Sequence, residues 1–153
     1  MKIWFALLGW IVLTFGAALS GIFIQPAGYY AALSKPWWSP PAWVFGPAWT
    51  ILYTLMAIAA WLIWCHGGWR AQRGPLRLYL LQLALNGLWT PLFFGLQNPG
   101  LACVEIVLLW VAIGLTLRSF FRTSRVAGLM FVPYWLWVTF AAALNCFIWR
   151  LQG

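Results

Sequence analysis

The chain has 153 residues, of which 65% are hydrophobic and only 7% are charged, and its formal net charge is +8. Soluble domains normally carry about 25% charged residues, and disordered chains combine low hydrophobicity with high charge, so both classes are excluded. Nucleic-acid binding, the usual interpretation of a basic chain, is also excluded, because the cations lie in the gaps between apolar runs and not on one polar face.

Five apolar runs follow one another along the chain, at 3–24, 42–65, 76–96, 101–121 and 126–149. The first run carries no charge, and as a helix it is about 33 Å long, enough to cross a hydrocarbon core about 30 Å thick. It is longer than the apolar core of a signal peptide, which has about 7–15 residues, so we expect a retained helix. We therefore predict an all-α fold, a single integral membrane domain that is a bundle of five transmembrane helices.

The segment between the first two runs, 25–41, differs from the other connections. It contains the prolines Pro26, Pro36, Pro40 and Pro41 together with several aromatic residues. Because proline at this density prevents a continuous helix, we expect a structured loop.

Few residues of this chain are suited to acid–base or metal chemistry. His66 has no second ligand at helical spacing, so we expect no metal site. Cys65, Cys103 and Cys146 are odd in number and lie in or beside apolar runs, which favours small packing residues over disulfides. Glu105, the only acidic residue, lies near the start of the fourth run. We expect it at the interface, solvated or paired with a cation, in preference to a proton relay.

Lysine and arginine are distributed unevenly between the two sides of the bilayer. With five spans, two of the nine Lys and Arg residues lie on the C-terminal side, namely Lys35 and Arg150. The other seven lie on the N-terminal side: Lys2, Arg70, Arg73, Arg77, Arg118, Arg122 and Arg125. The positive-inside rule therefore predicts a cytoplasmic N-terminus in a bacterial inner membrane.

Three runs place an aromatic side chain about one helical turn from a polar or small one, so that each set shares a helix face. The sets are Trp49 with Tyr53, Asn86 with Trp89, and Trp137 with Ala141 and Asn145. A buried Asn in a bilayer needs a hydrogen-bond partner. In one interpretation, Asn86 and Asn145 bond across the bundle and hold helices together. In the other, the aromatic faces enclose a cavity for a flat apolar ligand.

Three motifs rich in proline and aromatic residues lie in order along the chain: KPWWSPP at 35–41, LNGLWTPLFF at 85–94 and VPYWLW at 132–137. Together they closely resemble the TspO/MBR family, and the resemblance covers almost the whole chain. It implies a five-helix bundle, commonly a homodimer, with a ligand cavity under the first loop.

Members of that family bind porphyrins, haem-type tetrapyrroles and synthetic isoquinoline or benzodiazepine ligands, and some are reported to degrade protoporphyrin in light. The resemblance implies as ligand-binding residues Trp38, Trp49, Tyr53, Asn86, Trp89, Trp137 and Ala141. Trp49 and Trp137 would be the catalytic pair if degradation occurs. Some members bind cholesterol, but the tyrosine of that weak motif is replaced here by Cys146, so we do not expect recognition through it.

The resemblance implies a membrane receptor or transporter-like protein that binds protoporphyrin IX and other flat apolar ligands, linked to tetrapyrrole metabolism or stress regulation. Ordinary acid–base and metal machinery is missing from the sequence, and this favours binding over turnover. One alternative is an enzyme for light-dependent oxidative degradation of protoporphyrin IX. Another is a structural or regulatory partner in a membrane complex. We expect no required cofactor, porphyrin as a ligand, and the lipid bilayer and a second copy of the chain as partners.

Overall fold

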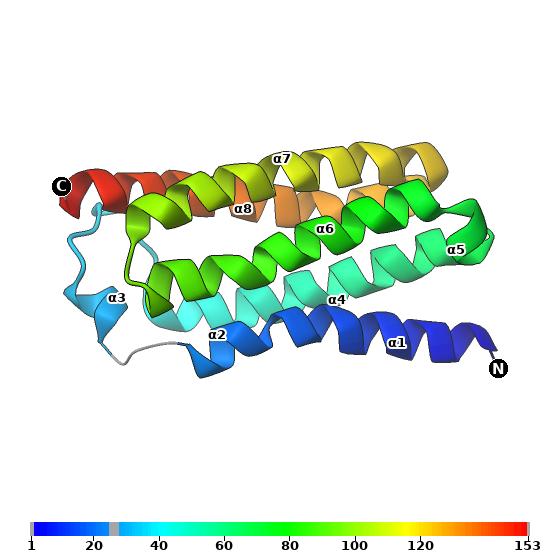
Figure 1. Ribbon diagram of the computed structural model, residues 1–153, viewed down its shortest axis with the longest axis horizontal. Coiled ribbons are helices and arrows are strands. Elements are labelled where there is room, and N and C mark those ends of the chain that lie inside the picture. The colour runs from blue at the N-terminus through cyan, green and yellow to red at the C-terminus, as the bar shows by residue number, and fades with distance from the viewer. Residues whose placement is uncertain (1, 25–27, 153) are drawn as a thin grey trace.

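A computed structural model of the chain describes residues 2–24 and 28–152. Five long helical segments run side by side along one axis, with α3 at one end of the bundle and α5 at the other (Figure 1). The segments long and apolar enough to cross a membrane are Ile3–Phe23, Ala42–Trp64, Arg73–Gly95, Pro99–Thr123 and Arg125–Gln152. The described residues contain no strand. The predicted all-α, five-helix membrane fold is therefore confirmed.

The first segment consists of two helices, α1 (Lys2–Ala17) and α2 (Leu19–Phe23), where a single helix was expected. The N–H of Ala18 donates to the carbonyl oxygen of Phe15 at 3.0 Å, a tighter i to i−3 bond that ends α1. Before the break, α1 packs mainly against α4, whereas after it α2 packs against α6. The break therefore separates the end of this segment from α4.

The described part of the proline-rich segment is structured. Gly28 has φ 85°, a backbone conformation that glycine adopts at little cost, and it precedes the short helix α3 (Tyr29–Ala32). A 3₁₀ turn, η1 (Ala42–Val44), then leads into α4 (Phe45–Trp64), and α5 (Gly68–Ala71) follows. We call residues 28–41 the cap. Pro26, part of the expected loop, lies outside the described residues.

The third segment changes its helical pitch at Pro91. It begins with α6 (Arg73–Thr90) and ends in a π-helix, η2 (Pro91–Gly95), in which the N–H of Leu96 donates to the carbonyl oxygen of Pro91 at 2.8 Å. Proline has no N–H for the regular i to i−4 bond, which explains why the α-helical pattern stops there.

The last two segments form an antiparallel hairpin, α7 (Pro99–Thr123) and α8 (Arg125–Gln152), which meet at Ser124. The side chain of Asn98 accepts a hydrogen bond from the N–H of Leu101 at 2.9 Å and caps the start of α7. This hairpin and α6 bury the aromatic centre of the bundle, where Tyr79 stacks on Phe120 at a ring distance of 6.1 Å.

Cys103 and Cys146 form a disulfide between the start of α7 and the end of α8, with Cα atoms 5.4 Å apart. The expectation of packing residues is therefore wrong for this pair, whereas Cys65 is free and exposed. Cys103 and Cys146 lie almost equally far along the chain from the turn at Ser124, so antiparallel packing brings them level. The odd number of cysteines in the sequence favoured packing residues, and so this pairing was not predicted.

Glu105 is also placed differently from the expectation. It is 5% exposed, and neither carboxylate oxygen has a hydrogen-bond partner among the described residues. It shares the buried stripe of α7 with Ala102 and Leu109, so the helix turns it toward its neighbours and away from solvent. Glu105 is thus neither solvated nor paired with a cation in this structure.

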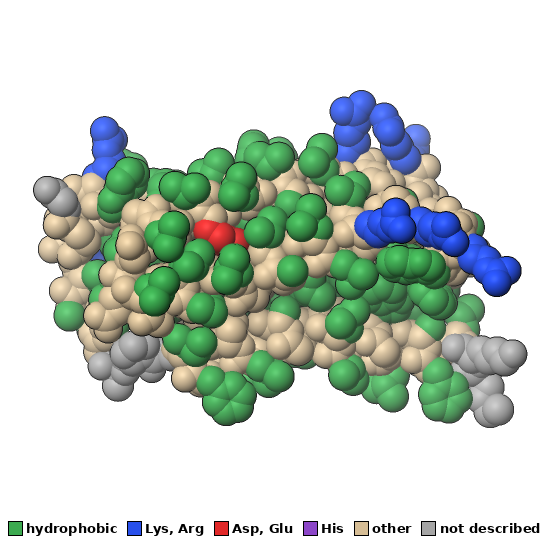
Figure 2. Space-filling model, in the orientation of Figure 1, with side chains coloured by type: hydrophobic (Ala, Val, Ile, Leu, Met, Phe, Trp, Pro, Cys, Tyr) green, Lys and Arg blue, Asp and Glu red, His purple; other side chains and the backbone are tan. Residues whose placement is uncertain are grey.

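The two ends of the bundle differ in the number of Lys and Arg side chains that they carry. On the face in Figure 2, Lys and Arg side chains gather at the end with α5 and the α7–α8 turn. Hydrophobic side chains cover the length between the ends. The cap, the α6–α7 connection and the disulfide all belong to the opposite end.

Candidate ligand cavity

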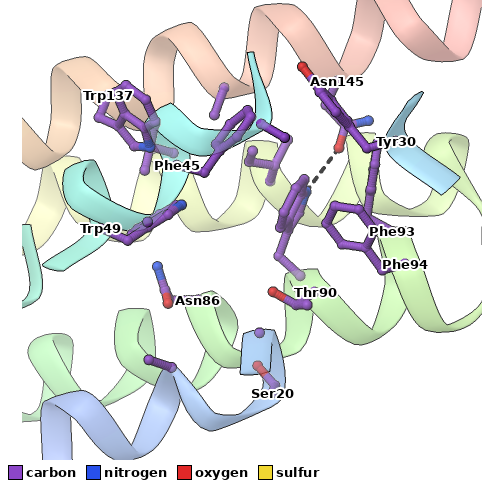
Figure 3. Close-up of a pocket in the computed structure, with 18 of the residues that line it drawn as sticks. Ser20, Tyr30, Phe45, Trp49, Asn86, Thr90, Phe93, Phe94, Trp137 and Asn145 are labelled. Carbon is purple, nitrogen blue, oxygen red and sulfur yellow. Dashed lines mark hydrogen bonds between the residues drawn. The ribbon is translucent and has the colours of Figure 1, made fainter. Parts of the chain in front are cut away.

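A cavity of about 790 Å³ lies inside the bundle at the end that holds the cap. Its walls come from α1 and α2, the cap, α4, α6, η2, α7 and α8 (Figure 3). The volume falls within the range of small-molecule sites, about 300–1,000 Å³. None of the described residues that line it carries a formal charge.

Trp49 and Trp137 form an aromatic corner between α4 and α8 (Figure 3). Trp49 stacks on Tyr53, one turn further along α4, with ring centroids 5.4 Å apart and planes inclined by 29°. Trp137 meets the Trp49 ring edge-on at 6.4 Å. The i, i+4 spacing within α4 is what brings the stacked pair onto one face. The corner offers flat apolar surfaces in two orientations.

Asn86 connects three helices beneath this corner. Its Oδ1 accepts a hydrogen bond from the Tyr53 hydroxyl at 2.6 Å, and its Nδ2 donates to the Tyr134 hydroxyl at 2.9 Å. The Tyr134 hydroxyl in turn donates to Oε1 of Gln82 at 2.9 Å. Asn86 also lines the cavity. The same amide therefore bonds across the bundle and forms part of the cavity wall, while the binding of a ligand there stays a prediction.

Asn145 performs the same double role at the other side of the cavity. Its Oδ1 accepts from the indole N–H of Trp89 at 2.9 Å, the bond drawn in Figure 3, and its Nδ2 donates to the carbonyl oxygen of Pro99 at 2.8 Å. The sequence placed Asn145 on the face of Trp137 but did not name it as a site residue. Its side chain ties α8 to α6 and to the start of α7.

The indole N–H of Trp137 differs from these satisfied groups. Its nitrogen is buried and has no hydrogen-bond partner among the described residues. Buried donors in folded proteins nearly always have a partner, since an unmatched one costs about 1–3 kcal/mol. Trp137 lines the cavity, but this nitrogen itself has almost no surface open to it.

The expected site residues are mostly brought together. Those that line the cavity are Trp49, Tyr53, Asn86, Trp89, Trp137 and Ala141. Trp38 is not among the lining residues, and its ring packs edge-on against Phe140 and Phe147 of α8 at 5.7 and 5.6 Å. Ligand binding by any of these seven side chains stays a prediction.

Several lining residues were not identified from the sequence. Some belong to α4, η2, α7 and α8, and a further group, from α2 and the cap, includes Ser20, Gly21 and Tyr30. The contribution of this further group depends on the break at Ala18 and on the fold of the cap, which no local periodicity reveals. The Tyr30 hydroxyl donates to the carbonyl oxygen of Pro40 at 3.2 Å, and burial raises the pKa of this phenol above its usual value, so it stays neutral.

Metal binding has no support among the described residues, where no three His, Cys, Asp or Glu side chains lie close enough together to hold an ion.

Comparison with known proteins finds similarity over most of the chain. A model of the TspO/MBR family matches residues 7–150. The tryptophan-rich sensory protein of Cereibacter sphaeroides is 41% identical over 136 residues, 88% of this chain and 84% of the relative. The tryptophan-rich protein TspO of Archaeoglobus fulgidus is 44% identical, covering 82% of this chain and 80% of the relative. The translocator protein of Homo sapiens is 37% identical, covering 88% and 82%.

Proposed function

We propose that this chain, which belongs to the TspO/MBR family, is a receptor or transporter-like protein for porphyrins and other flat apolar ligands, linked to tetrapyrrole metabolism or stress regulation. The observation that supports it is the uncharged cavity of about 790 Å³ with the Trp49–Trp137 corner. A planar ring stacked on one indole gains about 0.5–1.5 kcal/mol beyond its burial.

The uncharged wall also favours one placement of such a ligand. A carboxylate without a partner is expensive to bury in an apolar site, so the carboxylates of a porphyrin would stay at the cap end while the ring enters. The ring would then lie against the aromatic corner of Trp49 and Trp137. Six of the seven residues implied by the family resemblance surround this volume.

A change of cavity volume tests this proposal. Ala141 lines the cavity, whereas Ala143 on the same helix is exposed and does not line it. Ala141→Trp should fill the space and abolish saturable quenching of protein fluorescence by protoporphyrin IX in detergent, while Ala143→Trp should bind like the wild type. Undiminished binding by folded Ala141→Trp would show that the cavity is not the site.

The enzyme alternative has one observation in its favour. Trp49 and Trp137 lie edge to face at 6.4 Å, and Trp49 stacks on Tyr53, so oxidisable rings adjoin one another along the wall. Illuminating the protein with saturating protoporphyrin IX, with and without oxygen, separates turnover from binding. Products beyond those of free porphyrin, lost in Trp49→Phe or Trp137→Phe, would support degradation.

Two structural features support a cytoplasmic N-terminus in a bacterial inner membrane. The arginine-rich end lies on the N-terminal side, which matches the positive-inside rule. The disulfide lies at the other end, and disulfides persist in oxidising compartments such as the periplasm. The cavity end would then face the periplasm. A homodimer, which the family resemblance implies, is part of the same proposal.

A further inference from the structure

Lys35 is held by the backbone of the cap. Its Nζ donates to the carbonyl oxygens of Tyr30 at 2.5 Å, Ala31 at 3.3 Å and Leu33 at 3.3 Å. These three acceptors match the three N–H donors of an ammonium group. The same Nζ lies 4.7 Å from the centre of the Tyr30 ring, which adds a cation–π contact.

The position of this ammonium follows from the shortness of α3. The helix has four residues, and after it Leu33 adopts an extended conformation, φ −69° and ψ 142°. The carbonyl oxygens at a helix C-terminus lack intrahelical partners and carry partial negative charge, so a cation there is favourable. The chain's single acidic residue, Glu105, lies in α7. Backbone carbonyls therefore take the place of a carboxylate.

The residues whose carbonyls bind Lys35 form the outer wall of the cavity. Tyr30 and Ala31 line it, and Leu33 is buried in a cluster with Leu144 and Ile148, two lining residues of α8. The cap is attached to the bundle by few polar bonds, among them the one from Gln152 Nε2 to the carbonyl oxygen of Ser34 at 3.3 Å. Apolar contacts, such as that of Trp38 with Phe140, also hold the cap against the bundle, while most of the polar bonds that fix its shape are made within the cap.

We propose that Lys35 is a positioning residue that keeps the cap folded over the cavity and so sets how long a bound ligand stays. This inference rests on the proposed function of the cavity. Lys35 does not line the cavity and acts through Tyr30 and Ala31. Most affinity differences between variants of one site arise in the dissociation rate, and opening of the cap affects that rate directly.

The test compares Lys35→Met with Arg150→Met in the full-length protein. Arg150 is the other cation at this end and has no hydrogen bond to the described cap residues. Two probes are used, protoporphyrin IX and its uncharged dimethyl ester, each chased from the protein in stopped-flow fluorescence. We expect Lys35→Met to release both probes about tenfold faster, which is about 1.4 kcal/mol, and Arg150→Met to match the wild type.

Hydrogen exchange separates this role from general destabilisation. In ligand-free Lys35→Met, backbone amides of the cap should exchange faster, while those in the centre of α7 and α8 should exchange as in the wild type. Unchanged release of both probes, or faster release of the dicarboxylate alone, would overturn the inference, the second by showing direct contact with charge. Equal acceleration by Arg150→Met would also overturn it. Failure of the wild type to bind either probe would instead reject the proposed function and, with it, this inference.

Discussion

Single side chains at the cavity differ in whether their polar atoms are already paired. The indole N–H of Trp89 is bonded to Asn145, whereas the equivalent group of Trp137 has no partner among the described residues. Removing the first leaves an amide oxygen without its donor, and removing the second leaves nothing unmatched. A substitution at Trp89 therefore breaks a hydrogen bond of the bundle, whereas a substitution at Trp137 breaks none.

Trp137→Phe should weaken protoporphyrin IX binding modestly and leave folding unchanged. Phenylalanine keeps an apolar ring in the corner but offers a smaller stacking surface, and an aromatic contact contributes about 0.5–1.5 kcal/mol beyond burial, so the affinity should fall by roughly tenfold at most. Trp89→Phe is the matched variant, and we expect a lower unfolding temperature in detergent because its bond to Asn145 is lost. Equal effects of both variants on stability would contradict this assignment.

Asn86→Leu should affect stability and binding together. The substitution leaves the Tyr53 hydroxyl without its acceptor, whereas the Tyr134 hydroxyl keeps its bond to Gln82. Interhelical polar contacts in membranes average about 0.6 kcal/mol, so we expect a loss of about 1 kcal/mol in the free energy of unfolding. Denaturation in mixed micelles measures it. Lost binding with wild-type stability would show that the amide contacts the ligand and contributes nothing to the bundle.

Among the elements, the α7–α8 hairpin contributes most directly to the cavity end. Its disulfide joins the start of α7 to the end of α8, one residue from Asn145. The α8 residues 144–148 therefore have two attachments to α7, one covalent and one through the bond from Asn145 to Pro99. Three lining residues, Leu144, Asn145 and Ile148, lie in this stretch.

Thiol counting tests the hairpin connection. Protein purified without reductant and denatured with maleimide should gain one adduct, on Cys65, and should gain three only after reduction. Reduction should lower stability by less than the roughly 2–4 kcal/mol typical of disulfides, because the bilayer keeps the two helices adjacent in the unfolded state. Mass spectrometry reads the adducts, and the double variant Cys103→Ser, Cys146→Ser is the control. Three adducts before reduction would contradict the disulfide.

At the scale of the whole molecule, hydropathy alone predicted five spans, and helical spacing predicted which faces carry Trp49, Asn86 and Trp137. Both are local properties of the sequence, and the structure confirms the fold. The disulfide, the burial of Glu105 and the contribution of α2 were missed. Each depends on how separate helices pack, or on a break set by one backbone bond at Ala18, which spacing within one run does not encode.

The charge difference between the ends predicts the orientation of the whole bundle, and full-length protein in intact cells can test it. Cys65 is exposed at the arginine-rich end, and Ser34 is exposed in the cap, with the span Ala42–Trp64 between them. A membrane-impermeant maleimide, with outer-membrane passage ensured, should leave Cys65 unlabelled until the cells are lysed. The variant Cys65→Ser, Ser34→Cys should be labelled without lysis, because its cysteine would face the periplasm. Reversed labelling would show an inverted bundle, and labelling of both positions from the same side would exclude Ala42–Trp64 as a span.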